Sequence, residues 1–516
     1  MYAERFSYHD NQAVHSITNK PGKIMNKFFK ENKIFMIILF FGIAIRLVNI
    51  NIPLLEGTAT RQIQTAMIAR NFYINGFNLL YPQVDFLGSG PGYLVMEFPL
   101  LNLIAAVFYV LCGGVHEWVG RLISISFFAG SVIFLFNFIK RLFEERTALV
   151  TIIIFSVSPL SLIYSRAFMP DFEMLFFFIG ALYFMYLWSV GDKDRFFWVS
   201  ALFAMMALLT KIQSFCICIP LLAMIWQRQR LSFLFKVRSW AYLLIVLIPV
   251  ILWYIHAGSV HKVDSEYGAH AFKISYWLRP SLLISPKYLI KVFELGWMPM
   301  LTPVGFTLFL FGLFLKTESK QGTILWSWLA GTVVYMIVFC THIDELYYNL
   351  FFLPIMSIFA AITIVWIWQY ASKEMIFLHN RFALIMCIIF LIVLIGRYAG
   401  YAYTVPRGYR HIPVLAKTIE QMTDKKDLIV TSLPDGHATH YYSHRKGWSL
   451  GLPGNDPEKT KKAIARIEDL RQRGAKYFVS VCEDFLMQST DFRQYMQRRY
   501  RVVKEESGLY SIFLLE

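Results

Sequence analysis

The chain has 516 residues, of which 57% are hydrophobic and only 16% are charged, and its formal net charge is +16. Ordinary soluble domains carry roughly 25% charged residues, and a single soluble core stops growing near about 250–300 residues. So much apolar side chain, gathered in long runs, excludes a soluble enzyme, a nucleic-acid binder and a disordered scaffold as descriptions of the whole chain. The composition predicts a polytopic α-helical membrane protein.

The polar and apolar segments alternate along the chain. Residues 1–33 are polar and basic, and they predict a cytoplasmic N-terminal tail that leads into an uncleaved anchor helix. Apolar runs follow near 34–50, 98–114, 119–139, 147–165, 172–190, 196–210, 212–226, 240–257, 299–315, 323–341, 349–370 and 382–398. Basic residues gather in the short links between these runs, so they indicate cytoplasmic loops beside an anionic membrane and no nucleic-acid partner.

One apolar run, 98–114, decides the topology. It is short, contains Asn102 and ends in two glycines, whereas a spanning helix needs about 20 apolar residues. If this run is a re-entrant or juxtamembrane segment, every strongly basic loop falls on the cytoplasmic side. We therefore predict about eleven spanning helices in a transmembrane domain over 34–400, with a large first extracytoplasmic loop at 51–118. The ionisable residues at helix ends then converge on the extracytoplasmic face, where a functional site is expected.

The last segment, 401–516, is polar and predicts a small extracytoplasmic α/β domain. Residues 428–432 and 477–481 are typical of strands, and 457–474 has the apolar spacing of a helix. The segment contains neither a GxGxxG motif nor a P-loop, so it predicts no nucleotide site. The six cysteines of the chain lie mostly in apolar segments, and their spacing predicts no metal site and no disulfide framework.

Several carboxylates are candidates for general acid–base chemistry. Glu97 precedes Phe98-Pro99 at the membrane edge, where desolvation would favour a proton-accepting role. Asp85 lies in a loop flanked by proline and glycine, and Glu56 lies in the same outer loop. Asp171 follows Pro170 at the start of an apolar helix. Structural roles are alternatives for each of them: an Asx turn for Asp85, and a helix cap for Glu97 and Asp171.

The cations at the same face are candidates for binding a phosphate. Lys211 stands alone between two apolar runs, where an ammonium can act as a point charge or can simply snorkel to the interface. Arg61 and Arg166 are weaker candidates for the same phosphate, and a helical pattern over 60–73 would let Arg61 and Arg70 face one side. His342 and Glu345 have no recognised metal-ligand spacing, so they predict a polar helix entrance and no metal.

The order of several motifs resembles a known family. A single anchor helix and a long outer loop with carboxylates precede Arg121-Leu122, Lys140-Arg141-Leu142-Phe143, Ser158-Pro159, Ser165-Arg166, Pro170-Asp171 and Leu-Leu-Thr-Lys211. This order resembles the bacterial glycosyltransferase family 39, the protein O-mannosyltransferase and aminoarabinose-transferase-like group of the GT-C fold. The resemblance covers roughly residues 34–230 by motif and the remainder by hydropathy.

The resemblance implies an enzyme of the inner (plasma) membrane. Members of the family transfer a sugar from a polyprenyl-phosphate carrier to an acceptor on the extracytoplasmic face, and the acceptor is a glycan, a lipid or a protein. The resemblance implies no cofactor beyond this donor. Glu97 matches the family's second acidic motif, and Asp171 and Lys211 match its later Asp and Lys. Arg61-Gln62 stands where the family has an acidic pair, so the usual catalytic Asp is missing from its place.

The implied mechanism is a single displacement. A carboxylate, Glu97 or Asp85, removes the proton of the acceptor hydroxyl, and Lys211 with Arg61 or Arg166 neutralises the departing lipid phosphate. The alternative from another class is a transporter or flippase of lipid-linked sugars, which would need no base and would place its charges along a path through the membrane. A lipid-linked polysaccharide ligase or polymerase would share the donor and differ in the acceptor.

Overall fold

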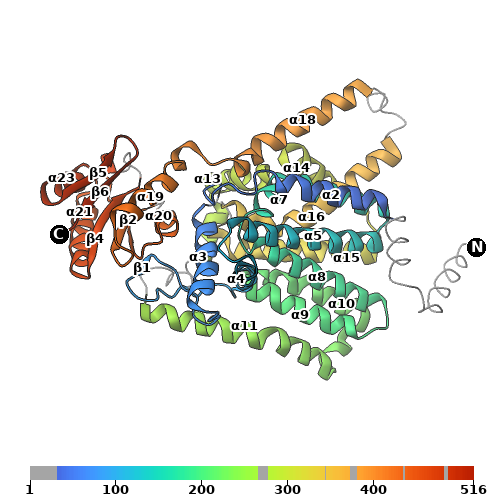
Figure 1. The fold of residues 1–516 in the computed structure, drawn as a ribbon. Helices are drawn as coiled ribbons and strands as arrows, with labels where there is room; N and C mark the ends of the chain where they lie inside the picture. Colours follow the sequence, from blue (N-terminus) through green and yellow to red (C-terminus); the bar gives the residue numbers. More distant parts are fainter. Residues whose placement is uncertain are drawn as a thin grey trace, which may run out of the picture.

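The apolar runs fold into helices that form the elongated body of the molecule in Figure 1. The structure, a computed structural model, describes residues 32–57, 59–264, 277–342, 345–371, 381–433, 436–481 and 486–516. The predicted tail 1–33 therefore lies almost entirely outside the described residues. The helices of the body are α2 (Lys33–Leu47), α4 (Leu100–Cys112), α5 (Glu117–Leu142), α6 (Glu145–Val157), α7 (Pro159–Tyr164), α8 (Asp171–Val190), α9 (Arg195–Thr210), α10 (Cys218–Gln229), α11 (Val237–Asp264), α13 (Pro286–Lys291), α14 (Met298–Phe314), α15 (Ser319–Val338), α16 (Leu353–Trp366) and α18 (Arg381–Ala399).

Only some of these helices are long enough to cross a membrane alone. Among the described residues, five segments are long and apolar enough to cross a membrane: α5, α8, Val237–Val260 of α11, α15, and Ile385–Tyr409, which begins within α18. A bent pair formed by α13 and α14 would make a sixth span. Helix α4 has 13 residues and is about 20 Å long, short of the roughly 30 Å of a hydrocarbon core. The predicted number of eleven spans is not confirmed.

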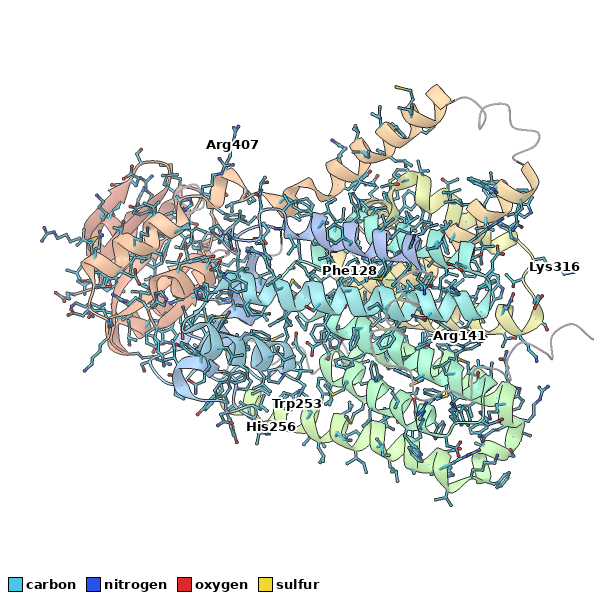
Figure 2. All side chains as sticks on the ribbon, turned by 45° about the vertical axis from the view of Figure 1, so that its right-hand side comes forward. Phe128, Arg141, Trp253, His256, Lys316 and Arg407 are labelled. Carbon is cyan, nitrogen blue, oxygen red and sulfur yellow. The ribbon has the colours of Figure 1, made fainter. Side chains whose placement is uncertain are left out.

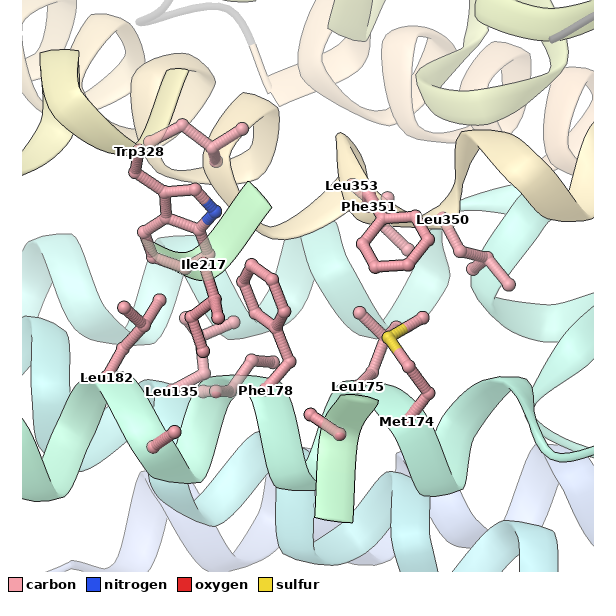
Figure 3. Close-up of a cluster of buried hydrophobic side chains, with 14 of the residues drawn as sticks. Leu135, Met174, Leu175, Phe178, Leu182, Ile217, Trp328, Leu350, Phe351 and Leu353 are labelled. Atoms are coloured by element: carbon pink, nitrogen blue, oxygen red, sulfur yellow. The ribbon is translucent and has the colours of Figure 1, made fainter. Parts of the chain in front are cut away.

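The core of the body lies between α5, α8, α15 and α16. Figure 3 shows Leu135 of α5, Phe178 of α8 and Trp328 of α15 meeting Phe351 and Leu353 in one cluster. These side chains are fully or almost fully buried. Such close packing holds helices together in a membrane, because lipid provides no hydrophobic driving force for their association.

A turn between α6 and α8 is fixed by a buried arginine. Pro159 opens α7, and the side chain of Ser158 caps it by accepting a hydrogen bond from the backbone N–H of Ser161 at 3.2 Å. Arg46 of α2 donates to the hydroxyl of Ser161 at 2.9 Å and also to Ser165. The serines around Pro159 therefore satisfy a guanidinium that is completely buried, and they orient the segment that leads to α8.

A six-stranded sheet lies at one end of the body, in the order β1-β3-β2-β4-β6-β5. Its strands are β1 (Leu87–Gly88), β2 (Leu428–Ser432), β3 (Gly447–Leu450), β4 (Ala475–Ser480), β5 (Arg501–Glu506) and β6 (Tyr510–Leu514). Strand β2 is parallel to β3 and β4, and the other pairs are antiparallel. The helices of this region are α19 (Ile412–Met422), α20 (Gly436–Ser443), α21 (Pro457–Gln472) and α23 (Thr490–Arg499). The strands predicted at 428–432 and 477–481 and the helix predicted at 457–474 correspond to β2, β4 and α21.

The first outer loop takes part in this sheet. Strand β1 comes from the loop 51–118 and pairs with β3, so that Leu87 lies opposite Trp448. The ring of Phe86 stacks on His437 of α20 with 3.8 Å between the ring centroids. The same loop contains α3 (Ala59–Asn75), which lies beside α20 and α4 (Figure 1). The assignment of 401–516 as a separate domain stays a prediction, since one edge strand of its sheet comes from elsewhere.

The two ends of the body differ in their side chains. Figure 2 shows Arg141 and Lys316 near the end away from the sheet, whereas Trp253 and His256 of α11 lie toward the end that carries α3, α4 and the sheet. The basic links 140–146 and 316–320 therefore share one end of the bundle, as the charge pattern predicts. The orientation of this end toward the cytoplasm stays a prediction.

Candidate active site

The first part of the site is an ion pair between Arg61 of α3 and Glu97, which lies just before α4. Both side chains are partly exposed, at 23% and 19%. The residues that flank Glu97 are tied to the helices of the body: the indole of Trp253 donates to the carbonyl of Met96 at 3.0 Å, and the N–H of Phe98 donates to the carbonyl of Leu209 at 3.0 Å. The carboxylate of Glu97 is therefore held at the edge of the bundle and remains partly exposed.

The second part is an ion pair between Lys211 and Asp171, with 2.5 Å between Nζ and Oδ1. Asp171 is the first residue of α8, and Lys211 directly follows α9 in an extended conformation. Among the described residues, Asp171 is the only hydrogen-bond partner of the Lys211 ammonium, and Oδ2 of Asp171 has none. Both groups therefore keep hydrogen-bonding capacity that the protein does not use.

Two tyrosines complete the site. Tyr347 and Tyr348 lie in the 3₁₀ segment η7 (Leu346–Phe351), and the Lys211 ammonium lies 5.0 and 5.9 Å from their ring centroids. The same tyrosines and Asp171 act electrostatically on Arg61, which places the two ion pairs in one cluster. Burial and their mutual contact raise the pKa of Tyr347, and burial raises that of Tyr348, so both phenols stay neutral hydrogen-bond donors. Sequence reasoning missed these two residues.

The predicted residues His342 and Glu345 lie beside this cluster. The ring of His342 lies 4.7 Å from Trp277 and 5.5 Å from Tyr348, and its Nδ1 contacts the hydroxyl of Thr341 at 2.7 Å. Glu345 is exposed and acts electrostatically on both tyrosines. No three His, Cys, Asp or Glu side chains come together as metal ligands in the part of the chain that the structure describes.

Three predicted residues are engaged elsewhere. Asp85 pairs with Arg70 and Glu56 pairs with Arg121, and all four side chains are buried. Arg166 donates to backbone carbonyls, to that of Ala402 at 2.6 Å and to those of Val48 and Asn49 at 2.9 and 3.0 Å. These contacts join the outer loop, the body and the C-terminal region.

The expectation that Arg61 and Arg70 face one side of their helix is wrong. They are nine residues apart, which is two and a half turns of an α-helix, so their side chains leave α3 on opposite sides. Arg61 reaches Glu97, whereas Arg70 reaches Asp85 and the carbonyl of Tyr441.

The arrangement brings two cations, two carboxylates and two phenols to one end of the membrane body. Such a set can neutralise a phosphate, accept a proton from a hydroxyl and exclude water on its buried side. Of the predicted residues, Arg61, Glu97, Asp171 and Lys211 meet here.

The sequence of this region matches a known family. Residues 96–254 match the family described as dolichyl-phosphate-mannose-protein mannosyltransferase. The matched segment contains Glu97, Asp171 and Lys211, three of the four charged residues of the cluster. A comparison with curated protein sequences finds no match.

The fold is also similar to solved structures. ArnT from Cupriavidus metallidurans, solved with undecaprenyl phosphate bound, superposes with a TM-score of 0.61 at 14% identity, over 94% of this chain and 98% of that one. The oligosaccharyltransferase of Archaeoglobus fulgidus in its apo form gives a TM-score of 0.60 at 13% identity, over 89% of this chain and 71% of that one. The chain is therefore similar to this mannosyltransferase family over residues 96–254, and it shares its fold with these two proteins.

Proposed function

We propose that the protein transfers a sugar from a polyprenyl-phosphate-linked donor to an acceptor hydroxyl at the extracytoplasmic face of the inner membrane. The observation that carries this proposal is the pair of Lys211 and Asp171, whose unused hydrogen-bonding groups lie beside Arg61 and Glu97 at one end of the bundle. The structure of ArnT with undecaprenyl phosphate supports a lipid phosphate as the donor's carrier.

In this proposal Glu97 is the base. Glu97 takes the proton of the acceptor hydroxyl, the acceptor oxygen forms a bond to the anomeric carbon, and the bond from that carbon to the phosphate oxygen breaks with its electron pair on the phosphate. Asp85 is not part of the proposed site, because it is buried in its pair with Arg70. Glu97 is the carboxylate that combines partial exposure with an ion pair to a cation of the cluster.

Lys211 is proposed to carry the main charge on the departing phosphate. Its ammonium has three donors and one protein acceptor, so it can bind a phosphate oxygen while Asp171 holds it in place. The neutral hydroxyls of Tyr347 and Tyr348 are proposed as further donors at the same phosphate. Arg61 is proposed to keep Glu97 oriented and to contribute positive charge, whereas Arg166 donates to three backbone carbonyls away from the cluster and is left out of the site.

The alternative function is transport of a lipid-linked sugar. A transporter would place charged groups along a path across the membrane. Here the described cluster lies at one end of the body, and the other large group of basic residues lies at the opposite end, next to Arg141 and Lys316. This separation favours the transferase.

Replacing Lys211 by Met tests the proposal. Full-length protein in lipid vesicles would be given a radiolabelled polyprenyl-phosphate sugar, and release of the polyprenyl phosphate would be measured together with transfer to cell-envelope acceptors. We expect Lys211→Met to lower turnover by about 100-fold or more, since a fixed positive charge at a developing anion is typically worth that much.

Two controls separate charge from folding. Lys140→Met removes a lysine that pairs with Glu145 at 2.9 Å at the other end of the bundle, and it should keep full activity. The double variant Lys211→Met with Asp171→Asn removes the unpaired buried charge, so it should fold well and remain inactive. Full turnover in Lys211→Met would contradict the proposed function.

A further inference from the structure

Glu173 is a carboxyl group that the proposed reaction does not use. It lies in the first turn of α8, two residues after Asp171, and it is completely buried. Among the described residues, neither Oε1 nor Oε2 of Glu173 has a hydrogen-bond partner. A buried carboxyl group without a cation or a side-chain hydrogen bond is costly in a membrane protein, which indicates a functional role.

The cations near Glu173 are already engaged. Arg61 pairs with Glu97, and Lys211 pairs with Asp171. Burial is the main influence on Glu173, followed by the negative charge of Glu97 and a contact with the backbone of Leu101 at the start of α4. An ionised Glu173 would therefore face a second carboxylate across an apolar interior, which is unfavourable for both groups.

The charge balance of the site gives the same result. Two cations, Arg61 and Lys211, face two carboxylates, Glu97 and Asp171, so the cluster is neutral. A third negative charge on Glu173 would leave the cluster with an excess of negative charge, and that excess would repel a phosphate. A protonated Glu173 keeps the cluster neutral and lets both cations act on an incoming anion.

We propose that Glu173 is a positioning residue for the transfer reaction: it is held as a neutral carboxylic acid behind Glu97, and the two form a carboxyl pair with a single negative charge, located on Glu97 and facing Arg61. This inference rests on the proposed function, because it assigns Glu173 to the same site. It adds a residue that touches neither substrate and acts only through Glu97.

The titratable groups of the cluster, together with Tyr254, which interacts with Glu97, define what a pH experiment can report. They are Glu97 before α4, Asp171 on the same helix, Lys211 after α9, Arg61 on α3, Tyr254 on α11, and Tyr347 and Tyr348 in η7. The hydroxyl of Tyr254 accepts from the N–H of Ile212 at 3.1 Å, next to Lys211. A change seen in a Glu173 variant must therefore be compared with a variant that leaves all these groups in place.

Infrared spectroscopy tests the protonation directly and needs no substrate. A protonated carboxylic acid has a C=O stretching band that is separate from the bands of ionised carboxylates. In purified full-length protein at neutral pH, we expect this band to lose intensity in Glu173→Gln and to shift in Glu97→Gln, because the neighbouring charge is gone. The control Glu145→Gln removes a carboxylate that pairs with Lys140, and it should leave the acid band unchanged. An acid band that is the same in Glu173→Gln and in wild type would overturn the proposal.

The pH profile of sugar transfer gives the functional readout. If Glu173 ionises at alkaline pH, a second negative charge appears beside Glu97 and transfer slows. Glu173→Gln cannot ionise, so the alkaline limb of its profile should lie about one pH unit higher than in wild type. A side chain that only fills space would leave this limb where it is, and an unmoved limb would contradict the proposal. If wild-type protein transfers no sugar, the proposed function fails, and the infrared result still decides the state of Glu173.

Discussion

Four ion pairs lie where the membrane body meets the outer loop, and they fall into two kinds. In the closed pairs, Arg70–Asp85 and Arg121–Glu56, all four side chains are buried, and each arginine also donates to backbone carbonyls of other segments. Arg121 also donates to the carbonyls of Ile50 and Ile52 at 2.7 and 2.6 Å. Arg70 also donates to the carbonyl of Tyr441 at 2.5 Å, and Asp85 also accepts from Asn71 at 3.1 Å.

In the open pairs, Arg61–Glu97 and Lys211–Asp171, hydrogen-bonding capacity is left over. The first pair is partly exposed, and in the second the ammonium has one acceptor and the carboxylate has one free oxygen. The charges of the two kinds are the same, so charge alone does not separate a structural ion pair from a site. The surroundings of the pair do: the closed pairs are buried among backbone carbonyls, whereas the first open pair is partly exposed and the ammonium of the second has two donors left for a substrate.

The largest effect on stability is expected from a variant that breaks a closed pair. Arg121→Met leaves the buried carboxylate of Glu56 without its cation, and removing one partner of a buried pair typically costs about 3–5 kcal/mol. We expect a corresponding loss in the free energy of unfolding, measured by denaturant unfolding of the purified protein. The double variant Arg121→Met with Glu56→Leu should recover most of this loss. Wild-type stability in the single variant would contradict the division into closed and open pairs.

A smaller effect on stability, with a clear effect on activity, is expected at an open pair. In Arg61→Met the partly exposed Glu97 is rehydrated, so the free energy of unfolding should change by less than about 1 kcal/mol. Sugar transfer should fall by about ten-fold or more, because the base loses its orienting partner. The matched control is Arg407→Met, an exposed arginine of the C-terminal region that Figure 2 shows on the surface. A parallel loss of stability and activity in Arg61→Met would place this pair among the closed ones.

The sequence predicts three of the four charged residues that the structure brings together in the proposed site from their position alone. Glu97, Asp171 and Lys211 each stand alone at the edge of an apolar run, and a charge there is costly enough to be a strong indication of function. The partners of the other charges could not be predicted. Glu56 and Arg121 are 65 positions apart, and nothing in a loop sequence shows which cation will reach which carboxylate.

Other features of the structure could not be predicted because their sequence patterns are common to many core segments. Tyr347 and Tyr348 lie next to an apolar run rich in aromatic residues, so they look the same as core side chains. Strand β1 has only two residues, too few for the alternation that predicts strands. The run 147–165 was predicted as one span, but Pro159 divides it into α6 and α7, since proline opens a new helix more easily than it continues one.

The smallest expected effect concerns the contact of the outer loop with the C-terminal region, where His437 stacks on Phe86. Burial, with a contribution from the neighbouring His440, lowers the pKa of His437 to about 3, whereas a histidine in the unfolded chain has a pKa of about 6.5. Between these two values the unfolded chain binds a proton that the folded chain does not, so the free energy of unfolding falls as the pH falls from about 6.5 towards 3.

His437→Phe keeps the ring and cannot bind the proton, so its loss of stability between pH 7 and pH 4 should be smaller than in wild type. The control His444→Gln changes an exposed histidine that pairs with Glu420, and it should keep most of the wild-type acid sensitivity. An equal loss in His437→Phe and wild type would show that acid acts elsewhere. The open and closed ion pairs contain no histidine, so a pH effect of this kind belongs to the sheet contact and leaves the site's own charges to the tests above.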